Sequence, residues 1–151
     1  MLQRSALLWS LLLAAGAAAA GEGYWECRGG HWIAVDAPAH PMPLKECGAL
    51  PRTTPTSAGS CVEQGGKWGA IGIFPAPVCS LPTRDAYRPC GDSNECEGPC
   101  LAELSAEEKQ SLIRGAAPGL SRLGKCAAHV PVMGCVAKVE RGVVRRVICF
   151  D

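Results

Sequence analysis

Aromatic side chains are scarce in this sequence, which has four Trp, two Tyr and two Phe among 151 residues. Glycine and proline, with 18 and 12 copies, are plentiful instead. Such a chain builds only a modest hydrophobic core. Its composition is typical of loops held together covalently rather than of a regular sheet or helix bundle.

An excess of charge of either sign is also missing. The chain has 15 basic and 14 acidic side chains, and removal of the first 20 residues, which contain Arg4, makes the two numbers equal. Nucleic-acid binding and polybasic attachment to a membrane need a concentrated excess of Lys and Arg, so we expect neither partner. Acids dominate residues 90–108 and bases dominate 109–146, which predicts two solvated faces of opposite sign that partly face each other.

A hydrophobic run long enough to span a membrane is missing as well. Residues 6–20 are apolar except for Ser10 and Gly16, and this run is shorter than the ~20 residues that a membrane helix needs. A basic residue, Arg4, precedes the run and three alanines end it, as in a secretory signal peptide. We expect cleavage after Ala20, a periplasmic or secreted product, and no stable membrane insertion after cleavage.

The sequence does not contain the motifs of common catalytic sites. The Gly-Gly pairs lie between cysteines rather than between a strand and a helix, which excludes a phosphate-binding loop or a dinucleotide fingerprint. No Gly-x-Ser-x-Gly frame surrounds the serines that we considered, which are Ser60, Ser80, Ser93 and Ser105. We therefore expect no catalytic residue, no cofactor and no enzymatic activity.

The titratable side chains are assigned structural roles. Asp85 is expected to form a turn or to pair with Arg84 or Arg88. Three acids in the next polar stretch are expected in turns and in solvent rather than as an acid/base pair: Asp92, Glu95 and Glu97. The histidines are too scattered for typical metal ligation, so we expect no metal site and surface or packing roles for His31, His40 and His129.

Cysteine is abundant, and all ten copies follow the signal segment: Cys27, Cys47, Cys61, Cys79, Cys90, Cys96, Cys100, Cys126, Cys135 and Cys149. An even number of cysteines in an exported chain predicts disulfides, here five, each stabilising the fold by roughly 2–4 kcal/mol. Ten cysteines allow on the order of a thousand pairings, so counting alone does not give the connectivity.

A repeated pattern indicates two of the bridges. Cys27 and Cys47 enclose a Gly-Gly-x-Trp segment followed by prolines, and Cys61 and Cys79 enclose another. The pattern predicts pairs 27–47 and 61–79. Each would have a Gly-Gly turn before a short strand, at 32–35 and 68–74, with the Trp over the bridge.

The C-terminal residues predict a hairpin around Arg141-Gly142, because β-branched residues fill both 134–140 and 143–150. A two-residue loop would place Cys135 opposite Ile148, whereas a three-residue bulged loop centred on Gly142 would place it opposite Cys149. We favour the second register because it permits a 135–149 bridge. For the four remaining cysteines we favour the pairs 90–100 and 96–126.

One helix is expected within residues 101–112, where Ser105 and Glu108 have the spacing of a capping box. The predicted fold class is a small disulfide-rich protein, mainly irregular or β, with one short helix and a C-terminal β-hairpin. Four parts are expected: a signal peptide at 1–20, an N-terminal appendage with Gly-Gly-x-Trp at 21–48, a linker rich in Pro, Thr and Ser at 49–60, and a disulfide-rich main domain at 61–151.

The main domain carries an ordered series of motifs. They are Cys61, Gly65-Gly66-x-Trp68-Gly69, Cys79-Ser-Leu-Pro-Thr-Arg-Asp85, Cys90, Asp92, Cys96-x-Gly-x-Cys100, Gly124-x-Cys126, Gly134-Cys135 and Cys149-Phe-Asp151. The series resembles an uncharacterised family of small cysteine-rich exported proteobacterial proteins, which implies a bacterial periplasmic or secreted protein and supplies no catalytic residue. More distantly, residues 61–79 resemble the start of a small haemolysin-named bacterial domain, whose acidic, Trp-bearing ending is replaced here by Cys96-Glu-Gly-Pro-Cys100.

The sequence leaves two candidate functions. The first is an exported, non-enzymatic binding or inhibitory module whose stapled loops present aromatic anchors, namely Tyr24, Trp25, Trp32, Trp68 and Phe74. Its ligand is unknown, and another exported or envelope protein is one candidate partner. The alternative is a periplasmic thiol-redox or metal-binding protein that uses Cys96 and Cys100, together with His129.

Overall fold

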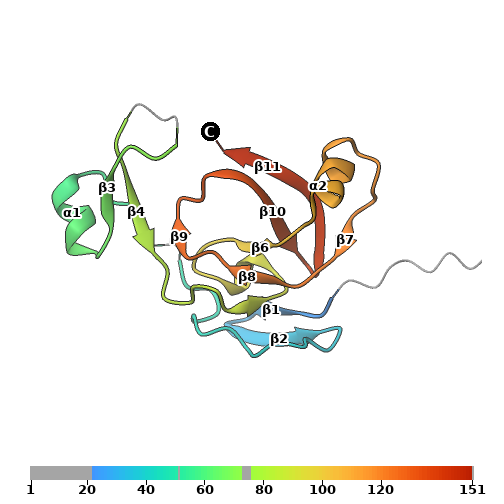
Figure 1. Cartoon of the computed structure of the whole chain (residues 1–151). Coiled ribbons are helices and arrows are strands. Elements are labelled where there is room, and N and C mark those ends of the chain that lie inside the picture. Colours follow the sequence, from blue (N-terminus) through green and yellow to red (C-terminus); the bar gives the residue numbers. More distant parts are fainter. Residues whose placement is uncertain (1–21, 51, 73–75, 151) are drawn as a thin grey trace, which may run out of the picture.

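The computed structural model describes residues 22–50, 52–72 and 76–150. The predicted signal peptide and Phe74 lie outside these ranges. Figure 1 shows a central curved sheet, a small hairpin below it, and a separate group of short strands beside a helix. Among the described residues, no helix is both long and apolar enough to cross a membrane.

The central sheet has six strands in the order β5-β8-β6-β10-β11-β7, and all its pairings are antiparallel. Its strands are β5 (Pro89–Cys90), β6 (Cys100–Ala102), β7 (Leu120–Ser121), β8 (Gly124–Cys126), β10 (Gly134–Glu140) and β11 (Val143–Phe150). A second sheet is the hairpin of β1 (Tyr24–Arg28) and β2 (His31–Val35). The third contains β3 (Lys67–Gly69), β4 (Val78–Pro82) and β9 (His129–Val130).

The main core lies on one face of the β10–β11 hairpin. Val139 and Val144 are fully buried there, and Leu112 covers them from helix α2 (Ala106–Ile113). Two disulfides, Cys90–Cys100 and Cys96–Cys126, belong to the same cluster. Sulfur therefore supplies much of the apolar volume that the missing aromatic side chains would otherwise provide.

The hairpin register confirms that Cys135 lies opposite Cys149, but the predicted loop is wrong. Glu140 pairs with Val143 across a two-residue turn, in which Arg141 and Gly142 both have positive φ, at 51° and 73°. These backbone angles suit the tight turn type that matches strand twist. The extra residue lies within the strands instead, where the pairing shifts from Val139–Val144 to Ala137–Val147.

Tertiary contacts hold this turn tight. Gly142 N–H donates to Gly91 O at 2.7 Å, and Arg141 N–H donates to the Asp92 carboxylate at 2.7 Å. A Cβ at Gly142 would meet Glu22 O at 1.8 Å, so only glycine leaves room for residues 22–50, which we call the N-terminal segment. The bulge then lets Val144 and Val147, three residues apart, both pack into the core.

Two α-helices are present where one was expected. Helix α2 has the predicted capping box of Ser105 and Glu108, but it begins at Ala106, because residues 100–102 form strand β6. Helix α1 (Ala58–Glu63) was missed, and its first residues occupy the end of the segment expected to be a linker. A short 3-10 helix, η1 (Ser93–Glu95), follows β5.

The five disulfides are Cys27–Cys47, Cys61–Cys79, Cys90–Cys100, Cys96–Cys126 and Cys135–Cys149, as the sequence analysis favoured. The chain is therefore a small, disulfide-rich and mainly β protein. Within the described ranges no cysteine is free.

The Gly-Gly-x-Trp repeat is not a structural repeat. Gly29-Gly30 is the turn between β1 and β2, and both residues have positive φ. Gly66 instead follows helix α1, and a Cβ there would lie 2.7 Å from both sulfurs of the Cys61–Cys79 bridge. Trp68 packs on that bridge as predicted, but strand β3 ends at Gly69.

The acidic and basic halves of the sequence partly face each other, as expected. Arg122 contacts Glu108 near the start of α2, and Lys125 Nζ lies 3.3 Å from Glu103 Oε1. These pairs are largely exposed, so each contributes at most about 1 kcal/mol to stability.

Candidate functional site

A groove of about 500 Å³ lies where the N-terminal segment meets the face of the β10–β11 hairpin that points away from the core. We call it the hairpin groove. Its lining comes from five places in the sequence: Lys45, Ala49, Leu50 and Arg52; Arg84; Ser93, Asn94 and Cys96 to Pro99; Val130 and Val132; and Val136, Lys138, Ile148 and Phe150.

The floor of the groove is aliphatic. Val136 lies opposite Ile148 in the hairpin register, and both point away from the face that carries Ala137 and Val147. Phe150 is 45% exposed at the open end of β11. The hairpin is therefore apolar on both faces, and only one face is covered by the core.

One end of the groove is basic, and we call it the cationic corner. Lys45 Nζ donates to Cys96 O at 2.8 Å, and Arg52 Nη1 donates to Pro82 O at 3.2 Å. Arg84 pairs with Glu97, which also lies 4.0 Å from the Arg52 guanidinium. Arg84 and Arg52 thus flank one carboxylate, Glu97, and Lys45 lies on the same lining.

Two groups in the corner have shifted pKa values. Burial lowers the pKa of the half-buried Lys45 ammonium below its ordinary value, against the attraction of nearby carboxylates. Burial alone would raise the pKa of Glu97, but hydrogen bonds from Arg84 and the charges of Arg84 and Arg52 outweigh it, and the net shift is downward. Glu97 therefore stays ionised, and Arg84 and Arg52 hold it in place.

The N-terminal segment supplies one wall of the groove, and two indoles fasten that segment. Trp32 Nε1 donates to Lys45 O at 2.9 Å, and Trp25 Nε1 donates to His40 O at 3.1 Å. The Cys27–Cys47 bridge closes the same loop. Lys45 is thus held at both its backbone and its ammonium group.

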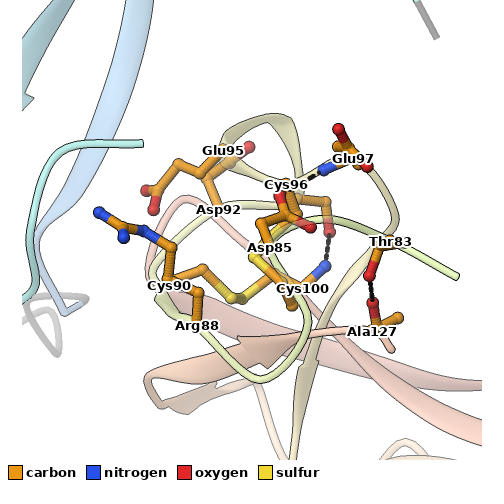
Figure 2. The surroundings of a disulfide bond; sticks show 12 residues. Thr83, Asp85, Arg88, Cys90, Asp92, Glu95, Cys96, Glu97, Cys100 and Ala127 are labelled. Carbon is orange, nitrogen blue, oxygen red and sulfur yellow. Dashed lines mark hydrogen bonds between the residues drawn. A yellow bond between two sulfur atoms is a disulfide. The ribbon is translucent and has the colours of Figure 1, made fainter. Parts of the chain in front are cut away.

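Three buried carboxylates lie near the groove, and Figure 2 shows them: Asp85, Asp92 and Glu95. Each accepts hydrogen bonds from backbone N–H groups. Asp85 accepts from Glu97 N–H at 2.7 Å, and Asp92 accepts from Asn94 and Arg141 N–H. Asp85 lies in a turn, which was one of its two expected roles, and pairs with neither Arg84 nor Arg88. Asp92 is in a turn as expected, but it is 5% exposed rather than solvated, and the Glu97 side chain is likewise only 10% exposed.

Glu95 corrects the expectation of a solvated acid. Its side chain is 2% exposed and accepts from Trp25 N–H at 2.7 Å and from Gly91 N–H at 3.2 Å. It also lies 2.6 Å from Nε2 of His40, whose side chain is 1% exposed. Two groups from the distant N-terminal part of the chain, Trp25 and His40, therefore converge with the nearby Gly91 on one carboxylate, because its oxygens have several lone pairs to share.

The other predicted site residues are dispersed. His31 and His129 are exposed, whereas His40 is the buried partner of Glu95. Tyr24, Trp25 and Trp32 line an adjoining hollow of about 290 Å³, which shares Lys45, Ala49 and Asn94 with the hairpin groove. None of the four described aromatic anchors, Tyr24, Trp25, Trp32 and Trp68, lines the groove, whose apolar residues are chiefly valine, isoleucine and leucine.

Cys96 and Cys100 are buried in two different bridges. The sulfurs of Cys90, Cys96 and Cys100 lie within 4.8 Å of one another, and an Asp85 oxygen lies within the same distance of the Cys96–Cys126 sulfurs. These donors would suit a soft metal only as thiolates, so metal binding there requires that both bridges first be reduced.

The sequence did not predict the groove, because its lining residues are far apart in the chain and come together only in the folded protein. The one local signal is in the hairpin, where apolar residues occupy successive positions of both strands rather than alternate ones. Such a pattern indicates that each face of the hairpin is either covered by the protein or available to bind a ligand.

Comparisons with family models, curated proteins and solved structures give no match for this chain. The resemblance to small exported proteobacterial proteins stays a prediction, and the function is argued from the groove alone.

Proposed function

We propose that this protein is an exported, non-enzymatic binding module that holds its ligand in the hairpin groove. The observation that carries the proposal is the apolar floor made by Val136, Ile148 and Phe150 beside a few fixed polar groups. A groove of about 500 Å³ with this composition falls within the range of small-molecule sites.

Two further features support the proposal. The bridges that frame the groove are typical of proteins that fold in an oxidising compartment such as the periplasm or the extracellular space. The buried carboxylates nearest the groove, Asp85 and Asp92, accept hydrogen bonds from backbone N–H groups, which suits a fixed frame. Holding the groove in one shape before binding lowers the entropy lost when a ligand binds.

A neutral, polarity-sensitive dye such as Nile red tests whether the groove binds apolar molecules. The double variant Val136→Thr/Ile148→Thr keeps β-branched side chains in the strands but makes the floor polar. We expect it to bind the dye about 10- to 30-fold more weakly than the unmodified protein, measured by fluorescence titration, because about 1 kcal/mol is lost per buried side chain.

The matched control is Val62→Thr/Ile113→Thr. These residues are 67% and 58% exposed on α1 and α2, away from the groove lining. Dye affinity should stay within twofold of the unmodified protein. Equal weakening in both double variants, or no dye binding by the unmodified protein, would contradict the proposed site.

Thiol labelling separates the proposal from the thiol or metal alternative. We expect iodoacetamide to add no label to the purified native protein in the absence of reductant, and mass spectrometry to show all ten cysteines oxidised. The reason is that Cys96 and Cys100 are 3% and 0% exposed within their bridges. Rapid labelling of either residue, or zinc that copurifies with the protein, would favour the alternative.

A further inference from the structure

The lining of the cationic corner carries more bases than acids. Lys45, Arg52 and Arg84 contribute three positive charges, and the acid that lines the groove with them, Glu97, contributes one negative charge. Lys138, farther along the floor, lies 3.6 Å from Glu140 Oε1 and is half-buried. The other acids that attract Lys45 are Asp85, Asp92 and Glu95, which are buried and do not line the groove. An anionic group in the corner would therefore face the three cations directly.

Hydrogen-bond donors remain available in the corner. Among the described residues, Lys45 donates to Cys96 O, Arg52 donates to Pro82 O, and the Arg84 side chain donates through Nε to Glu97. A lysine has three N–H donors and an arginine has five, so most of these donors are free for a ligand. The Arg84 side chain is 79% exposed and can reach an incoming group.

The corner and the aliphatic floor belong to one groove, so a ligand that satisfies both has a charged end and an apolar body. The volume of about 500 Å³ suits a single small molecule. The aliphatic floor offers few groups that would pair with a peptide backbone, whereas an alkyl chain needs none.

We propose that the hairpin groove binds a single-chain amphiphile that ends in a carboxylate. The alkyl chain lies over Val136 and Ile148, and the carboxylate lies between Lys45 and Arg84. Arginine binds a carboxylate through two parallel N–H bonds, and the partly apolar surroundings strengthen such contacts. This inference rests on the proposed function and adds the chemical class of the ligand.

Three detergents with the same chain length but different head groups test the charge preference: dodecanoate, dodecyltrimethylammonium and dodecyl maltoside. Each is titrated below its micelle concentration into the full mature protein, with binding followed by calorimetry. We expect dodecanoate to bind about 10-fold more tightly than the neutral maltoside, and the cationic detergent to bind most weakly. Raising the salt from about 0.02 M to about 0.5 M should weaken dodecanoate binding several-fold and leave maltoside binding nearly unchanged.

Two variants with opposite expected effects test whether the preference for an anionic head group comes from the cationic corner. Arg84→Gln should weaken dodecanoate binding about 5-fold, whereas Glu97→Gln, which removes the competing carboxylate, should strengthen it about 3-fold. Arg146→Gln is the matched control, because it changes the net charge equally at an exposed residue of β11 outside the groove lining. Circular dichroism confirms that each variant is folded.

The outcomes separate this inference from the proposed function. Suppose that Nile red binds and that its affinity depends on the floor residues. If the three detergents then bind equally, or if Arg146→Gln weakens dodecanoate binding as much as Arg84→Gln does, the inferred charge preference is wrong but the groove is still a binding site. If Nile red does not bind, the proposed function itself fails. A rise in dodecanoate affinity for Glu97→Gln together with a fall for Arg84→Gln supports both.

Discussion

Replacing Glu95 with glutamine is expected to lower the free energy of unfolding by about 3 kcal/mol. The buried carboxylate accepts from Trp25 N–H and Gly91 N–H and contacts His40. Glutamine has nearly the same shape, but its NH₂ group would face one of these donors and leave that donor without an acceptor. Urea unfolding followed by tryptophan fluorescence measures the loss.

Glu103→Gln is the control for Glu95→Gln, since it also removes one negative charge. The Glu103 side chain is 89% exposed and lies 3.3 Å from Lys125 Nζ, so we expect a change below about 0.5 kcal/mol. If both variants unfolded at the same urea concentration as the unmodified protein, the role of Glu95 in joining the N-terminal segment to η1 would be refuted.

The second large effect is expected at the buried bridge Cys96–Cys126. The two residues are separated by 30 positions, and chain-entropy arguments assign such a bridge about 3.6 kcal/mol. Both cysteines are 3% exposed in the core, so the double variant Cys96→Ala/Cys126→Ala also leaves unfilled space. We expect a total loss of about 5 kcal/mol, measured by urea unfolding without reductant.

The exposed bridge Cys135–Cys149 gives the comparison. Its residues are separated by 14 positions, which predicts about 3 kcal/mol from chain entropy. Both lie on exposed parts of the hairpin, so little packing is lost with them. Cys135→Ala/Cys149→Ala should therefore destabilise the protein less than the buried pair. The reverse order would show that the core does not depend on the buried sulfur.

Local patterns account for the parts of the fold that were predicted correctly. The capping box at Ser105 depends on residues three positions apart, and the 135–149 pair depends on a single hairpin. The same reasoning failed for strands β5 to β9, because most of them have only two or three residues and show no periodicity. Helix α1 was missed for a similar reason, since its six residues include glycine and serine.

The hairpin shows how tertiary contacts override a local choice. From the strands alone, a longer loop was the simpler way to bring Cys135 opposite Cys149. The contacts of Gly142 with Gly91 and Glu22 instead favour a tight turn, and the extra residue is accommodated by a bulge within the strands. The register was predictable because the bridge requires it, whereas the position of the bulge was not.

The sequence by itself determined the disulfide-rich, mainly β class, the capped helix and the 135–149 pair, because each depends on composition or on residues close in the chain. Only the tertiary structure decided the candidate site. Trp25 meets Glu95 across 70 positions, and Lys45 meets Cys96 across 51. Neither contact has a local sequence signal. A glutamate looks the same in the sequence whether the folded chain buries it or leaves it in solvent. The hairpin groove exists because those distant contacts fasten the N-terminal segment beside the uncovered face of β10 and β11.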